Sequence, residues 1–124
     1  MLLIIIFNFI LIICHGEELQ PNKKVVLTGK LETKTYFDAN NKPEEEYVLI
    51  LNKHIDVAED KGFGGPEKNV SEIQLIVYSD DQDKANKLIN KNVEVTGSLF
   101  HGHTAHHHTK ILLAVDSLKG VAPK

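Results

Sequence analysis

Apolar residues, many of them β-branched, recur along the chain in short runs that predict β-strands. Five runs have strand length, at residues 25–31, 47–51, 72–78, 93–100 and 111–115. We expect the first to continue to Phe37 and residues 54–57 to extend the second. The intervening residues 38–43 and 59–69 are rich in Gly, Pro, Asn and Asp, which is typical of turns and loops.

One segment, residues 79–90, has a helical pattern. Ala85, Leu88 and Ile89 form a short apolar stripe, and aspartates fill the first turn, where the helix dipole favours negative charge. Ser79 with Gln82 three positions later predicts a capping box. The expected order is therefore three strands, one helix and two strands.

This order predicts a mainly β fold, a small five-stranded OB-like Greek-key barrel with one helix between strands 3 and 4. Thr28-Gly29 in the first strand is echoed by Thr96-Gly97 in the fourth. Glycines inside strands suit the tight curvature of a small barrel. The alternative is that two valine-rich strands resemble each other by coincidence.

Composition narrows the range of partners. With 124 residues, 42% of them hydrophobic, the chain has the size of one domain, which we place at residues 17–124. A net charge of -3 argues against nucleic acid, which requires a Lys/Arg patch, and against anionic membrane surfaces. The absence of tryptophan also leaves few platforms on which bases could stack.

The amino-terminal segment has the pattern of a signal peptide. Residues 2–13 are apolar apart from Asn8, a run too short to span a bilayer. We expect a signal peptide at residues 1–16, cleaved after Gly16, and a periplasmic or secreted protein with no membrane span after cleavage. The alternative is a lipid anchor at Cys14, although Ile13 before it is not the small residue that such an anchor requires. Cleavage after Gly16 leaves no cysteine, hence no disulfide.

Histidines are concentrated between the last two predicted strands. Five of the seven lie within eight positions: His101, His103, His106, His107 and His108. The flanking strands predict a β-hairpin whose tip carries these side chains. A two-residue turn at Thr104-Ala105 places His101, His103, His106 and His108 on one face. A three-residue turn, which aligns the odd-numbered apolar positions of both strands, pairs His103 with His107 instead. Both registers place His101 and His103 on the side of Leu99.

Imidazoles without thiolates suit zinc, copper(II) or nickel. The candidate ligands are His101, His103, His106 and His108, with His107 as a further candidate. An oxygen ligand from Asp56, Glu59 or Asp60 would complement them. One alternative is a structural polar network, in which the imidazoles bond to each other, to Thr104 and Thr109, and to the backbone. Another is a mobile loop that binds metals only adventitiously.

The chain contains no nucleophile elbow, phosphate loop or His-Glu-x-x-His motif. We therefore expect a protein that is not an enzyme. The alternative to metal binding is a protein-binding module, such as an inhibitor or accessory factor of a cell-envelope protein. Its contact surface would combine the 59–69 loop with the histidine tip.

The segment around the histidines, GSLFHGHTAHHHT at residues 97–109, resembles a bacterial exported family catalogued as domain of unknown function 4431. Relatives carry the signature Gly-[Thr/Ser]-Leu-Phe-His-x-His-Thr-x-His-His-His-Thr. The likeness is close over residues 93–115 and weaker over 70–92. Ala105 stands where glycine is usual, which disfavours a tight turn there. The resemblance implies export and no particular activity.

Overall fold

The structure, a computed structural model, describes residues 18–122. The predicted signal peptide, residues 1–16, and the alternative anchor at Cys14 lie outside the described residues. The elements are the strands and helix β1 (Glu18–Leu19), β2 (Lys24–Phe37), β3 (Pro43–Val57), β4 (Glu67–Ile76), α2 (Ser79–Lys87), β5 (Asn92–His101) and β6 (Ile111–Gly120).

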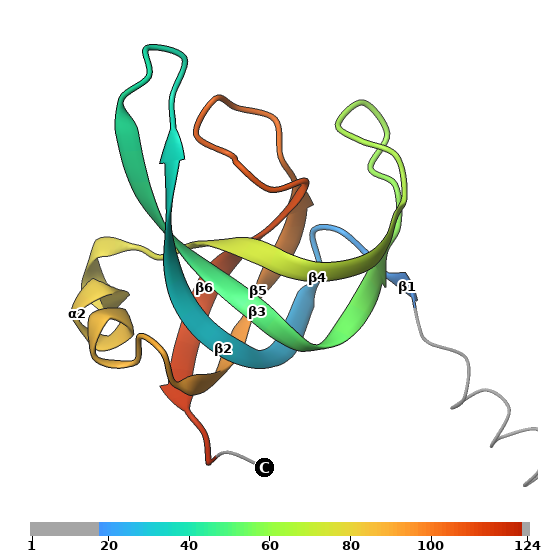
Figure 1. Ribbon diagram of the computed structural model, residues 1–124. Helices are drawn as coiled ribbons and strands as arrows, with labels where there is room; N and C mark the ends of the chain where they lie inside the picture. The colour runs from blue at the N-terminus through green and yellow to red at the C-terminus, as the bar shows by residue number, and fades with distance from the viewer. Residues whose placement is uncertain (1–17, 123–124) are drawn as a thin grey trace, which may run out of the picture.

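The five long strands pair in a ring, in the order β2–β3–β4–β6–β5 and back to β2 (Figure 1). Neighbours are antiparallel except β4 and β6, which run parallel over residues 74–76 and 112–114 only. Since that contact is short, the ring closes only partly there. β1 adds a two-residue parallel strand beside β3. The predicted mainly β, OB-like barrel, with a helix between its third and fourth long strands, is confirmed.

Two glycines allow the strands to bend. A side chain at Gly29 would collide with the carbonyl group of Ile50, and one at Gly97 with that of Ala114. The register of β5 against β6 also shifts between Thr96 and Gly97, as at a β-bulge. The two glycines therefore mark close approaches between strands, in agreement with the curvature predicted for them.

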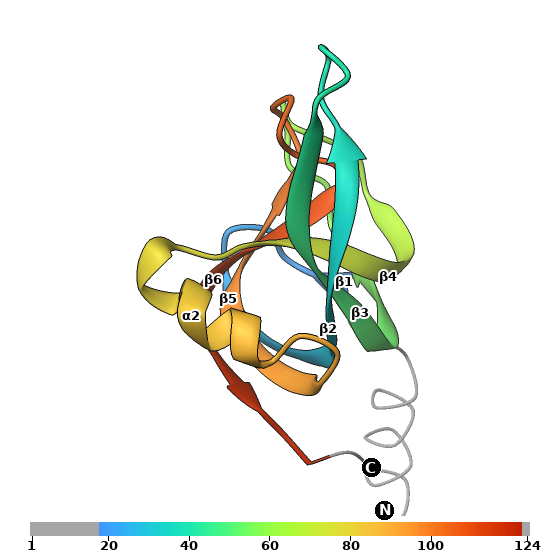
Figure 2. The same cartoon turned by 60° about the vertical axis from the view of Figure 1, so that its left-hand side comes forward.

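The core fills the inside of the barrel with alternate residues of each strand. Its largest members have at most 1% of their surface exposed: Leu31, Leu49, Ile73, Leu75, Leu99 and Leu113. Burial of one such side chain stabilises the fold by roughly 1.5–3 kcal/mol. Helix α2 packs through Ala85 at the end of the barrel away from the long loops (Figure 2).

The helix begins at Ser79 as predicted, but its cap and its end differ from the prediction. Tyr78 is the residue before the first turn and makes no side-chain cap, so the capping box at Ser79 is wrong. Ser79 is itself helical, and the amide of Gln82 instead donates to the Val77 carbonyl at 3.2 Å. The helix ends at Lys87, before Asn90, whose φ of 69° is left-handed backbone that cannot continue a helix.

The predicted tight hairpin turn is wrong. β5 ends at His101, which pairs with Ile111, so residues 102–110 form a wide loop, here called the histidine loop. Neither predicted register forms across paired strands, but His103 and His107, which the three-residue turn would pair, contact each other within the loop, with ring centroids 4.9 Å apart. The alignment of odd-numbered positions is correct, since Leu99 pairs with Leu113. The backbone N–H of Gly102 donates to the carbonyl of Lys110, and a side chain at Gly102 would collide with the carbonyl oxygen of Thr109, so the chain folds back there.

Candidate functional site

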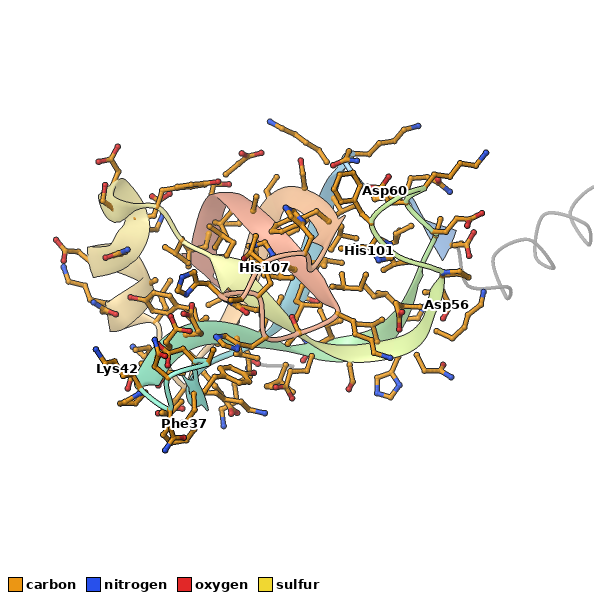
Figure 3. The ribbon with its side chains drawn as sticks, turned by 90° about the horizontal axis from the view of Figure 1, so that it is seen from above. Phe37, Lys42, Asp56, Asp60, His101 and His107 are labelled. Carbon is orange, nitrogen blue, oxygen red and sulfur yellow. The ribbon has the colours of Figure 1, made fainter. Side chains whose placement is uncertain are left out.

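Three connecting segments gather at one end of the barrel. They are the β2–β3 turn at residues 38–42, the β3–β4 loop at residues 58–66 and the histidine loop (Figure 1). Seen from above, His107 lies between Phe37 and Lys42 on one side and Asp60 on the other (Figure 3). The histidine loop therefore lies between the other two, and its side chains reach both.

The outer face of the sheet carries a row of residues that the histidine loop meets. Val48, Gln74, Leu112 and Phe100 are in register across β3, β4, β6 and β5. Their neighbours in each strand point into the core, so these side chains point outward. Val48, Gln74 and Leu112 are nevertheless at most 1% exposed. Gly102 lies close to the Leu112 side chain, which places the histidine loop over this row.

Gln74 attaches the histidine loop to this outer row. Its side-chain oxygen accepts the backbone N–H of His108 at 2.7 Å, and its side-chain nitrogen donates to the carbonyl of His106 at 3.0 Å. The same nitrogen donates to a carboxylate oxygen of Glu46 at 3.1 Å. The backbone N–H of Gln74 donates to the Thr109 hydroxyl at 3.0 Å. The amide of Gln74 thus joins both β3 and the histidine loop to β4.

The carboxylate of Glu44 joins two histidines to β3. His106 Nδ1 lies 2.6 Å from one of its oxygens, and His108 Nε2 lies 3.0 Å from the other. The side chains of Glu44 and His108 are 20% and 10% exposed, whereas that of His106 is 71% exposed. His108 also stacks on Tyr36, with ring centroids 4.5 Å apart and planes at 3°. His108 is therefore fixed on two sides, while His106 faces solvent.

Glu46 completes a compact group with Glu44 and His108. Glu44 and Glu46 alternate along β3, so they point to the same face. One ligand atom from each of the three residues lies within 4.8 Å of the others. Burial raises the pKa of the Glu46 carboxyl above its usual value; the charge of His108 opposes this, and that of Glu44 adds to it. When His108 is neutral, nothing within this group balances the negative charge of the two carboxylates.

A second group of histidines holds the other side of the loop. His101 is 3% exposed, and its Nε2 donates to the carbonyl of Ala58 at 2.9 Å. His103 Nδ1 donates to the carbonyl of His101 at 3.0 Å, and the His103 ring packs on Phe63 at 5.3 Å between centroids. These contacts attach the histidine loop to the β3–β4 loop.

His107 is an acceptor within the histidine loop. Its Nδ1 accepts the backbone N–H groups of His103 at 3.0 Å and of Thr104 at 3.3 Å. Burial, and then the neighbouring His103, lower the pKa of His107 below its usual value. His107 is therefore neutral, with its Nδ1 lone pair engaged and its remaining proton on Nε2, a form that presents no free lone pair to a metal ion.

The structure divides the predicted ligands into two sets. It brings His106 and His108 together at Glu44, and it places His101 and His103 with His107 on the side of the β3–β4 loop. Two of the predicted oxygen ligands lie away from the Glu44 group. Asp56 accepts a hydrogen bond from the backbone of Asn69, and Asp60 accepts one from the side chain of Asn22.

Sequence reasoning missed Glu44, Glu46 and Gln74. The alternation Glu44-x-Glu46-x-Val48 opening a strand was the available signal, because it places two carboxylates on one face. That this face meets the histidines follows only from the ring of strands, in which residues 62 and 64 positions apart become neighbours.

Within residues 18–122, no helix is long and apolar enough to cross a membrane.

A comparison with curated proteins finds no match to the chain. The model of the family described as "Domain of unknown function (DUF4431)" matches residues 72–119. This segment contains Gln74, helix α2, β5 and the whole histidine loop. It begins after Glu44 and Glu46, which lie outside the match. Over residues 72–119, and so over the segment that carries the histidine signature, the chain is similar to that family of unknown function.

Proposed function

We propose that this protein binds a divalent transition-metal ion at Glu44, Glu46 and His108, with His106 as a fourth ligand. The observation that carries the proposal is the convergence of the two carboxylates and the His108 imidazole, whose ligand atoms lie within 4.8 Å of one another. Bound zinc requires ligand atoms about 2.0–2.2 Å from the ion. Small side-chain rotations would bring the group to that geometry.

The charge of the group supports this proposal. Two carboxylates beside neutral imidazoles carry two negative charges in a partly buried site, which a divalent ion would balance. In the structure, each of the two imidazoles hydrogen-bonds to Glu44 through the ring nitrogen that would bind the ion. Metal binding would therefore displace protons, and the affinity should fall as the pH drops below about 6.5, the range in which histidine titrates.

The mixture of imidazole and carboxylate defines the class of metal. Imidazole favours zinc, copper(II) and nickel, whereas magnesium and calcium prefer sites built from oxygen alone. His101, His103 and His107 are left out of the proposed ligand set because their bonds hold the histidine loop instead. The protein would be a metal-binding module with no enzymatic activity.

Calorimetry of the purified protein with zinc, copper(II) and nickel at pH 7.5 tests the proposal. We expect saturable one-to-one binding that is lost in His108→Ala and strongly weakened in Glu46→Gln. Two matched controls are His54→Ala and Glu45→Gln, since both side chains are exposed on β3 and outside the group. The proposal is wrong if no saturable binding occurs, or if the site variants and the controls bind equally.

A protein-binding module is the second candidate, favoured by two exposed aromatic residues near the loops. Phe37 is 61% exposed at the β2–β3 turn and Phe63 is 56% exposed on the β3–β4 loop. Pull-down from an extract of the producing cells, with and without chelator, tests this function. A partner retained equally in both conditions, but lost with Phe63→Ser, would favour it over metal binding.

A further inference from the structure

Gln74 is a buried polar residue on the outer face of the sheet. It is 1% exposed and lies near the end of β4, between Ile73 and Leu75, which point into the core. Burial of an amide without hydrogen bonds costs roughly 1–3 kcal/mol. The side chain avoids this cost because both its oxygen and its nitrogen are bonded. An apolar residue could fill the same space without needing hydrogen bonds. The presence of an amide at this position therefore points to a role for its bonds.

The bonds of Gln74 lead to the proposed metal ligands. Its nitrogen donates to one carboxylate oxygen of Glu46 at 3.1 Å, which leaves the other oxygen free for an ion. The amide also bonds to the backbone carbonyl of His106 and to the backbone N–H of His108, on either side of His107. A single side chain thereby fixes the orientation of one ligand and the backbone that carries two others.

Only an amide of this length can make this set of bonds. The N–H of His108 requires an acceptor, whereas Glu46 and the His106 carbonyl require a donor. Glutamate offers only acceptors when ionised, and methionine offers neither a good donor nor a good acceptor. Asparagine carries the same groups on a shorter side chain.

We propose that Gln74 is the positioning residue of the metal site, which aligns Glu46 with the two histidines before the ion arrives. The inference rests on the metal-binding function proposed above. Residues that hydrogen-bond to metal ligands without contacting the ion typically contribute a factor of about 10–100 in metal affinity. Gln74 does not itself contact the ion in this arrangement, because its amide is occupied by Glu46 and the loop backbone.

The test compares wild type with Gln74→Met and Gln74→Glu in the full chain, loaded with copper(II). We expect both variants to bind copper(II) about 10–100-fold more weakly. We also expect a changed electron paramagnetic resonance spectrum of the bound copper, because the ligands are no longer aligned. Gln82→Met is the matched control, since the Gln82 amide donates to the backbone carbonyl of Val77, just before α2 and away from the proposed ligands.

The spectrum separates positioning from a merely structural role. If the variants melt at lower temperature but bind copper(II) with the wild-type affinity and spectrum, Gln74 supports the fold alone and the inference is wrong. If wild type binds no metal, the proposed function fails and this inference fails with it. Should Gln74→Met not fold, Gln74→Asn, which keeps both amide groups, takes its place with the same two readouts and the same expected changes.

Discussion

At the scale of single residues, the site is defined by two carboxylates that alternate along one strand. Glu44 is bonded through both oxygens to histidines, and Glu46 accepts from Gln74. Burial is the main reason that the pKa of Glu46 is raised. A carboxyl whose pKa rises on folding favours the folded state at low pH and opposes it at higher pH. Glu46, a ligand of the proposed metal site, is therefore kept ionised at some expense of stability, which a bound cation would offset.

Glu46→Gln should stabilise the metal-free protein while weakening metal binding. Folding raises the pKa of Glu46 above 4.5, so its contribution to stability is present below 4.5 and is lost as the pH rises through the raised pKa. Glutamine does not titrate and can still accept the bond from Gln74. In chelator, the melting temperature of the variant should exceed that of wild type at pH 7.5, and the difference should shrink at pH 4. An equal gain in Glu45→Gln would contradict the role of burial.

His107 should make stability depend on pH in the opposite direction. Burial lowers its pKa below 6.5, so its contribution to stability is present above that value and is lost as the pH falls through the lowered pKa. His107→Asn keeps an acceptor for the N–H groups of His103 and Thr104 but does not titrate. Thermal unfolding in chelator at pH 7.5 and 5.5 should show a smaller loss of stability for the variant. Equal losses of stability in wild type and in His107→Asn would contradict this role of His107.

At the scale of elements, the histidine loop is the part whose structure the sequence did not predict. The alternation of Val93, Val95 and Leu99 identified the core face of β5, and odd positions of β6 matched it. Leu112 obscured the register because it is also apolar, although it points outward. Its burial depends on the loop folding back over it, which is a tertiary contact with no local signature. Local pattern therefore predicts strands but not the course of this loop.

Gly64→Ala should destabilise the contact between the histidine loop and the β3–β4 loop. A Cβ atom at Gly64 would lie 2.5 Å from Nδ1 of His101, a ring held in place by its bond to Ala58. Overpacking of this kind typically costs about 1–3 kcal/mol. Gly65→Ala is the matched control, since nothing lies within 4 Å of its Cβ position. Urea unfolding would measure both, and equal midpoints would show that His101 does not fix the β3–β4 loop.

At the scale of the whole molecule, the order of elements predicted the barrel, because few arrangements bury five strands and one short helix in a chain of this size. Histidine spacing alone did not predict the Glu44–Glu46–His108 group. β3 and the histidine loop are far apart in the sequence, and the folding of the barrel brings them together. The histidines of the proposed site were recognisable from sequence, whereas their carboxylate partners required the topology.

Export is a prediction about the whole chain. Residues 2–13 form an apolar run of signal-peptide length, and Gly16 is a small residue at a plausible cleavage point. We expect intact-mass analysis of the protein from producing cells to give a mature chain that begins at Glu17. A lipid adduct on Cys14 would support the anchored alternative, and a mature chain that begins at Met1 would contradict export.

The proposed metal site would connect parts of the barrel that are distant in sequence, so an ion should stabilise the fold as well as occupy the site. A ligand that binds only the folded state adds about 2.7 kcal/mol at a concentration 100 times its Kd. Zinc should therefore raise the melting temperature of wild type and of His54→Ala but not that of His108→Ala. Amide hydrogen exchange should slow in the histidine loop and around Glu44, with little change in helix α2, which lies at the other end of the barrel. Protection confined to α2, or an equal rise in melting temperature for His108→Ala, would place the ion elsewhere.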